Sequence, residues 1–232
     1  MDYKYDIFIS YKWGDERKKW VDEILRPILI SGINEVIDKK ILTPEVIFKD
    51  TDNVPKGATL DVSLQKAVAF SKCMVCVVSL PYFKASAWCP TEFSAMLHRE
   101  IATGIRSTGN YMGLIFPIIF VEEKEATPEK KSPVYEYAEL RKLIFGISPL
   151  ELDYEKYNRV SKSFKDSDEY DELRNIIRRW VRDSIRPQLE RINNNYPWKS
   201  EWDTPQYLLD PYQNFKDQYC SPPPPPPNPS IA

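Results

Sequence analysis

Residues 73–79, CMVCVVS, decide the fold class of this 232-residue chain. They form a continuous apolar run of strand length, without the polar alternation of a half-exposed strand. A strand that is apolar on both faces is typical of the centre of a parallel sheet covered by helices on both sides. The flanking sequence must therefore supply further parallel strands and the helices that connect them.

Strand-like and helix-like segments alternate on both sides of this run. Strand patterns occupy Tyr5–Tyr11, residues 45–49 and residues 113–121, and residues 143–152 hold a fifth short strand. Pro117, inside the fourth strand pattern, indicates an edge position or a bulge. The order of the segments predicts an α/β, flavodoxin-like fold, which is an open parallel β-sheet with helices on both faces.

The last third of the chain changes character twice. Residues 168–186 are patterned as a long amphipathic helix, which Pro187 ends or kinks. Residues 193–220 are polar but carry seven aromatic side chains, which indicates packing against the domain or a partner. Six consecutive prolines in residues 221–232 are typical of polyproline II or disorder. We therefore expect a domain over 1–192, with core motifs in 5–121 and a C-terminal helix at about 168–192, an aromatic-rich extension over 193–220 and a proline-rich tail over 221–232.

Composition and charge exclude several classes of function. Lys and Arg total 32 against 34 Asp and Glu, so no basic field favours nucleic acid or a membrane surface. The chain has 7 glycines and neither a GxGxxG nor a GxxxxGK[ST] phosphate-binding loop. Its longest apolar stretch, residues 113–121, is too short to span a bilayer, and its amino terminus lacks a secretory pattern. We expect a cytoplasmic protein with no nucleic-acid or membrane partner.

The cysteines and the single histidine predict neither a metal nor a redox site. Cys73 and Cys76 form a CxxC motif, but side chains three residues apart on a strand point to opposite faces. No second CxxC follows, and His98 alone cannot build a His-rich metal site. Cys89 has no histidine near it in sequence, so we interpret it as a packing residue and not as a nucleophile.

Ligands of open parallel sheets bind beyond the carboxyl ends of the strands, and three motifs there resemble the TIR (Toll/interleukin-1 receptor) domain family. The first is YDIFISY at Tyr5–Tyr11, and the second is FKD at residues 48–50 with the turn-rich loop after it. The third, SLPY at residues 79–82 followed by SAWCPTE at residues 86–92, is similar to the segment of catalytically competent members. The resemblance covers residues 1–121 well and reaches weakly to about residue 192.

The resemblance implies an enzyme that cleaves the bond between nicotinamide and ribose in NAD⁺, which leaves ADP-ribose or a cyclic ADP-ribose-type product. It implies that Glu92 is the catalytic residue. The physics agrees: nicotinamide is a good leaving group, so a carboxylate need only stabilise the positive charge that develops on the ribose. No metal or resident cofactor is implied, because NAD⁺ is the substrate. The alternative for Glu92 is a solvated carboxylate in the first turn of a helix.

The resemblance also implies a set of substrate-binding residues near the strand ends, which are Ser10, Tyr11, Lys12, Trp13, Asp50, Tyr82 and Trp88. Trp88 shares a helix face with Glu92, four residues on, and either stacks a cationic ring or packs in the core. Lys12 either meets a phosphate or is simply exposed. Asp50 either holds ribose hydroxyls or caps a turn, and Trp13 is unusual for the family.

Assembly follows from the same resemblance, because TIR active sites are typically completed by a neighbouring domain. The loop from Asp50 to Gly57 would then mediate self-association. Resemblance to standalone microbial members implies antiphage immune signalling with a separately encoded sensor or effector. The alternative is a non-catalytic adaptor, which needs the loop but not Glu92. A nucleoside-processing glycosyltransferase is a third interpretation, which leaves the first motif unexplained.

The sequence departs from the family pattern in two places. Tyr82 and Trp88 are separated by one residue more than in the closest plant-type pattern, which predicts a different pocket mouth. The region after residue 121 is also longer, with an added helix and the aromatic-rich extension. We expect that region to affect oligomerisation or the choice of partner.

Overall fold

The computed structural model describes residues 2–12, 14–37, 39, 42, 45–48, 60–79, 82–83, 86, 88–106, 112–121, 142–144 and 146–219. The strands in these residues are β1 (Tyr5–Tyr11), β2 (Glu45–Ile47), β3 (Ser71–Val78), β4 (Ile115–Val121) and β5 (Leu150–Asp153). The helices are α1 (Asp15–Trp20), α2 (Arg26–Val36), α4 (Leu60–Phe70), α6 (Trp88–Thr103), α8 (Tyr154–Tyr157), α9 (Lys162–Lys165), α10 (Asp168–Trp180), α11 (Arg186–Asn195) and α12 (Pro205–Tyr219). Two π-helical turns, Val21–Leu25 and Val181–Ile185, and a 3₁₀ turn, Ser200–Asp203, connect some of them.

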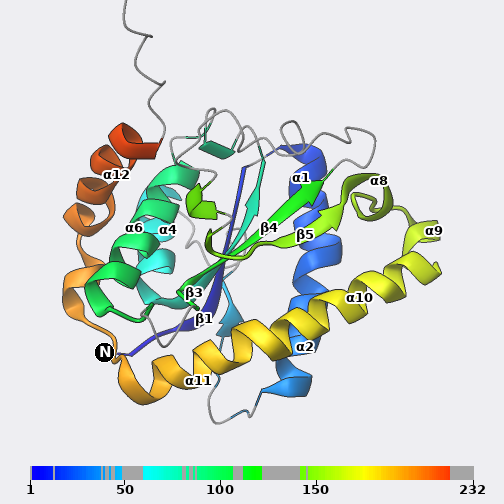
Figure 1. Ribbon diagram of the computed structural model, residues 1–232, viewed down its shortest axis with the longest axis horizontal. Coiled ribbons are helices and arrows are strands. Elements are labelled where there is room, and N and C mark those ends of the chain that lie inside the picture. Colours follow the sequence, from blue (N-terminus) through cyan, green and yellow to red (C-terminus); the bar gives the residue numbers. More distant parts are fainter. Residues whose placement is uncertain are drawn as a thin grey trace, which may run out of the picture.

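The strands form one parallel sheet in the order β2-β1-β3-β4-β5 (Figure 1). Strand β3, which contains the CMVCVVS run, lies at the centre and is buried at every residue. This strand order is the flavodoxin-like one. The predicted fold class is therefore confirmed, and the reason is that an all-apolar strand is stable only with neighbours and helices on every side.

Two hydrophobic cores lie on opposite faces of the sheet. Helices α1, α2 and α10 cover the first face, and α4 and α6 cover the second, with α12 packed along the outer side of α6 (Figure 1). Alternation along the strands sends Ile7 and Ile9 into the first core and Phe8 into the second. Cys73 and Cys76 likewise separate into the first and second cores, as their spacing on the strand predicts.

Pro117 does not lie on an edge strand, which corrects the expectation from its residue type. It pairs with Cys76 in β4, and β4 runs between β3 and β5. The first pair of β4 with β5 is Ile118 with Leu150, one residue later. At Pro117 the strand is therefore paired on the β3 side only, so a residue without an N–H can be accommodated on the other side.

Pro187 does not end the helical run either. The run continues from α10 through the π-helical turn Val181–Ile185 into α11, where Pro187 lies in the first turn. A wider π turn separates the proline from the preceding α-helical ladder, and the first turn of a helix needs no N–H from it. Pro27 follows the π-helical turn Val21–Leu25 in the same way.

Aromatic residues of the extension pack onto the domain around a buried arginine. The ring of Trp198 stacks on Phe70 at 4.8 Å and 8°. The guanidinium of Arg99, which is fully buried, lies 4.4 Å from the ring centroid of Trp202 and donates to the carbonyl oxygen of Ser71 at 2.7 Å. The expectation that these aromatics contact the domain is met, whereas the proposed boundaries stay a prediction and the proline-rich tail lies outside the described residues.

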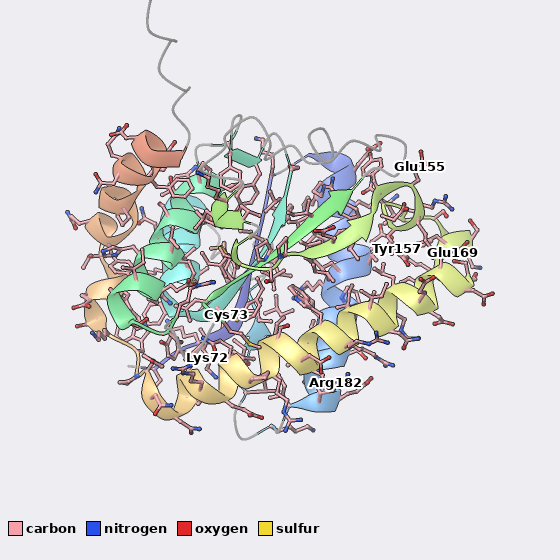
Figure 2. All side chains as sticks on the ribbon, viewed as in Figure 1. Lys72, Cys73, Glu155, Tyr157, Glu169 and Arg182 are labelled. Carbon is pink, nitrogen blue, oxygen red and sulfur yellow. The ribbon has the colours of Figure 1, made fainter. Side chains whose placement is uncertain are left out.

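A buried ion pair joins β1 and β3 near their amino ends. The Lys72 ammonium donates to the Asp6 carboxylate at 2.7 Å, and the two side chains are 4% and 0% exposed. Figure 2 shows Lys72 beside Cys73 at the amino end of β3. The candidate site lies at the other, carboxyl end of these strands, so this pair belongs to the fold and not to the chemistry.

Candidate functional site

The sheet changes its winding direction between β1 and β3. From β1 the chain continues to β2 on one side, then crosses to β3 on the other side. In open α/β sheets, ligands bind at the carboxyl ends of the strands at such a switch point. Ser10 lies at the carboxyl end of β1, and Tyr82 follows the end of β3, so the topology brings residues from two sequence motifs to this point.

Three of the side chains singled out from the sequence form one hydrogen-bonded network. The Ser10 hydroxyl donates to Oε2 of Glu92 at 2.5 Å. Its Oγ also lies 2.6 Å from the hydroxyl oxygen of Tyr82. Ser10, Tyr82 and Glu92 are 1%, 0% and 6% exposed, so the network is closed off from bulk water in this chain.

The direction of the hydrogen bonds follows from the number of protons. Serine has one hydroxyl proton, and Ser10 gives it to Glu92, so the Tyr82 hydroxyl must be the donor to Ser10. Burial raises the pKa of the Tyr82 phenol well above its usual value, and the nearby Cys76, Cys89 and Glu92 raise it further. Tyr82 therefore keeps its proton at neutral pH, and the chain of donors runs from Tyr82 through Ser10 to the carboxylate.

Helix α6 carries Glu92 into the interior. The Ser86 hydroxyl accepts from the Cys89 N–H at 3.1 Å, three residues on, in the manner of an N-cap. Trp88 begins the helix, and Glu92 lies one turn further along, beyond the first turn. A side chain with 6% exposure in the second turn is not a solvated first-turn carboxylate. The structure thus excludes the alternative that the sequence left open for Glu92.

Lys12 and Trp88 lie on the same side of the sheet as the network. Trp88 is half-buried, four residues before Glu92 on α6. Lys12 is half-buried, and its charge acts on Cys89: burial raises the pKa of that thiol to about 12, the Glu92 charge adds to the rise, and Ser86 and Lys12 oppose it. The positive charge of Lys12 therefore lowers the pKa of Cys89, in the first turn of α6.

Tyr11, by contrast, is not brought to Glu92. The side chain of Tyr11 is 8% exposed and packs in the first core, on the face of the sheet opposite Ser10. The alternation of β1 makes this unavoidable, because Ser10 and Tyr11 are neighbours. Trp13, Asp50 and the loop from Asp50 to Gly57 lie outside the described residues.

Comparison with known proteins identifies the family. A sequence profile of the family described as TIR domain matches residues 7–143, which is more than half of the chain. The chain belongs to the TIR domain family. No curated protein matches it. Among solved structures, the TIR domains of the activated Roq1 resistosome directly recognizing the pathogen effector XopQ align with 16% identity and a TM-score of 0.36 over 92% of this chain and 96% of that one. At this similarity the likeness carries no inference about activity.

The sequence did not predict the aromatic residues that pack against the hydrogen-bonded network of this TIR domain. Phe83 and Phe93 contact each other at a centroid distance of 5.5 Å, and both contact Phe215 of α12. Phe83 and Phe93 had a signal, since both flank motif residues. Phe215 is one of the seven aromatic residues expected to pack on the domain or a partner, but the sequence did not indicate which residues it contacts, because it lies far along the chain and outside the family match.

The part of the TIR domain that the structure describes contains no group of three or more His, Cys, Asp or Glu side chains that could hold a metal ion. In the same residues, no helix has the length and apolar character needed to cross a membrane.

Cys89 is expected to be chemically inert despite its place beside Glu92. With a pKa of about 12, its thiolate fraction at pH 8 is about 10⁻⁴, against about a quarter for an unperturbed thiol. Alkylation by iodoacetamide at pH 8 should therefore be on the order of 10³-fold slower than that of a free thiol. A Cys220→Ser background removes the one cysteine outside the described residues, and mass spectrometry of the peptide then measures the rate. Rapid labelling of Cys89 in the folded protein would contradict this.

Proposed function

We propose that this TIR domain is an NAD⁺ nucleosidase that cleaves the bond between nicotinamide and ribose. The observation that carries the proposal is the buried Glu92 carboxylate, fixed by the Ser10 hydroxyl at 2.5 Å at the switch point of the sheet. Burying a charged group is costly, so a buried carboxylate at the ligand-binding edge of the sheet is a candidate for a functional role. A pre-oriented carboxylate is what an oxocarbenium-like ribose requires.

In the proposed reaction, the bond between the ribose C1′ and the pyridinium nitrogen breaks, and its electron pair stays on nicotinamide. Nicotinamide leaves as a neutral molecule, so no acid has to protonate it. Glu92 stabilises the positive charge that develops at C1′. Attack by water, which gives up a proton to solvent, yields ADP-ribose, and attack by a nitrogen of the adenine base yields a cyclic product.

The other side chains have proposed roles in binding. Trp88 stacks on the cationic nicotinamide ring, and Lys12 attracts the diphosphate as a point charge. Tyr82 and Ser10 hold the carboxylate and shape the pocket. Asp50 and Trp13 are supported only by the family resemblance, and we propose for them no more than a position at the rim of the pocket. Tyr11 packs in the first core, so we propose no contact between it and NAD⁺.

We further propose that the domain acts in an assembly, in the cytoplasm, as a signalling component of antiphage defence with a separately encoded partner. The support for this proposal is the sequence resemblance to standalone microbial TIR proteins. The loop from Asp50 to Gly57 would form the contact between copies, so that neighbouring domains complete each site.

The decisive experiment incubates the concentrated protein with NAD⁺ and follows nicotinamide by chromatography. We expect nicotinamide together with ADP-ribose or a cyclic isomer, and the retention of the second peak identifies the product. A dilution series tests the assembly, because specific activity should fall as the subunits separate. Absence of nicotinamide at every protein concentration, with crosslinking showing that the copies do assemble, would favour the non-catalytic adaptor.

A further inference from the structure

The C-terminal helix α12 reaches the candidate active site from outside the family match. It packs along α6 (Figure 1), and the ring pairs show that the two helices run antiparallel. Tyr207, early in α12, contacts His98, late in α6, at a centroid distance of 5.4 Å. Phe215, late in α12, contacts Phe93, early in α6, at 5.6 Å. The end of α12 therefore lies beside the first turns of α6, which carry Glu92.

Phe215 closes a cluster of aromatic rings that ends at Tyr82. Its side chain is 4% exposed and stacks on Phe83 at 6.1 Å with an interplanar angle of 27°. Phe83 in turn meets the Tyr82 ring edge-on at 4.7 Å and Phe93 at 5.5 Å. Tilted and edge-on aromatic pairs have preferred geometries, so each ring restricts the orientation of the next.

The tyrosine at the end of this cluster is a hydrogen-bond donor in the network. Tyr82 reaches Ser10 at 2.6 Å, and Ser10 holds Glu92 at 2.5 Å. Hydrogen bonds weaken steeply when the donor tilts away from the acceptor. The position of the Phe215 ring can therefore affect the orientation of the Glu92 carboxylate, because Phe83, Tyr82 and Ser10 connect the two.

We propose that Phe215 is a positioning residue for the active site: through Phe83 it holds the Tyr82 hydroxyl against Ser10 and thereby orients the Glu92 carboxylate. The proposal rests on the proposed function for its kinetic consequence, but its structural step does not. It makes the C-terminal helix part of the catalytic apparatus, and it makes any partner that displaces α12 a regulator of the site.

The kinetic test compares Phe215→Ala with a matched control. Phe164→Ala removes a ring of equal size that is 3% exposed in the first core, on the opposite face of the sheet. Circular dichroism first fixes a temperature at which both variants are folded. We expect Phe215→Ala to lower kcat for nicotinamide release by roughly 10- to 100-fold, since small misplacements of a catalytic group have effects of this size. KM should change by less than about threefold, and Phe164→Ala should keep kcat near that of the wild type.

A double-mutant cycle shows whether Phe215 acts through Tyr82. Once Tyr82→Phe has removed the hydroxyl, adding Phe215→Ala should lower kcat little further, because both changes break the same chain of contacts. Phe215→Leu, which refills most of the space, should recover most of the activity and also serves if the alanine variant does not fold. Additive losses, or an equal loss in Phe164→Ala, would reduce Phe215 to an ordinary core residue and overturn the proposal.

A second readout needs no NAD⁺. In protein labelled with 3-fluorotyrosine, the ¹⁹F resonance missing from Tyr82→Phe is that of Tyr82. We expect this resonance to move in Phe215→Ala or Phe215→Leu and to stay in place in Phe164→Ala. An unmoved resonance overturns the positioning role even if NAD⁺ is cleaved. If the resonance moves but the protein releases no nicotinamide, the positioning role is supported and the proposed function is contradicted.

Discussion

Glu92→Gln is expected to lower kcat for nicotinamide release by about 10²- to 10³-fold, the size of effect seen when one preorganised electrostatic group is removed. Glutamine has nearly the same shape, and its amide oxygen can still accept from Ser10, whose oxygen lies 2.5 Å from Glu92 Oε2. What it lacks is the negative charge that stabilises the developing ribosyl cation. KM should change little, because the lost interaction strengthens only in the transition state. Quantitative chromatography of nicotinamide over time measures both constants.

The matched control for this variant is on the same helix. Glu100 is the other buried glutamate of α6, at 3% exposure, and its Oε2 accepts from the Leu114 N–H at 2.6 Å. We expect Glu100→Gln to lower thermal stability while the folded enzyme keeps its kcat. Glu92→Gln should show the reverse, with unchanged or higher stability, since active-site charges are held at a cost to the fold. Full activity in Glu92→Gln would show that the Glu92 charge is not needed for cleavage and would overturn its catalytic role.

Lys72→Met is expected to destabilise the fold strongly. It leaves the Asp6 carboxylate, 0% exposed, without the ammonium that now lies 2.7 Å away. Breaking a buried ion pair by removing one partner costs about 3–5 kcal/mol of unfolding free energy. For a domain of this size that corresponds to a fall of roughly 6–20 °C in melting temperature. Denaturant titration and calorimetry measure the two quantities.

Two further variants separate this cause from simple loss of packing. In Asp6→Asn with Lys72→Met both charges are gone, so the double variant should be less destabilised than the sum of the single changes. Lys165→Met breaks a half-exposed pair with Glu23 and should leave the melting temperature nearly unchanged. Additive losses in the double variant would show that the pair does not interact energetically.

Much of the fold was readable because short-range pattern and long-range packing agree. The CMVCVVS run predicted a central strand, and β3 is that strand, buried on both faces. The edge position expected at Pro117 and the helix end expected at Pro187 were wrong for one reason: a residue type states which hydrogen bond is missing, not whether a neighbour needs it. At Pro117 the neighbouring strand has not yet begun, and at Pro187 a π-helical turn resets the ladder.

For this protein, the sequence by itself determined the parallel α/β fold, the TIR motifs and Glu92 as the residue to test, because each of these is a local pattern of residue types. Only the tertiary structure decided that Glu92 is buried and accepts a hydrogen bond from Ser10, and that Tyr11 packs in the core on the other face of the sheet. It also decided that Phe215 contacts Phe83, which in turn contacts Tyr82. These facts depend on the parallel pairing of β1 with β3 and on the packing of α12 along α6. Contacts between residues so distant in sequence are fixed by how the layers pack, and no local spacing contains that information.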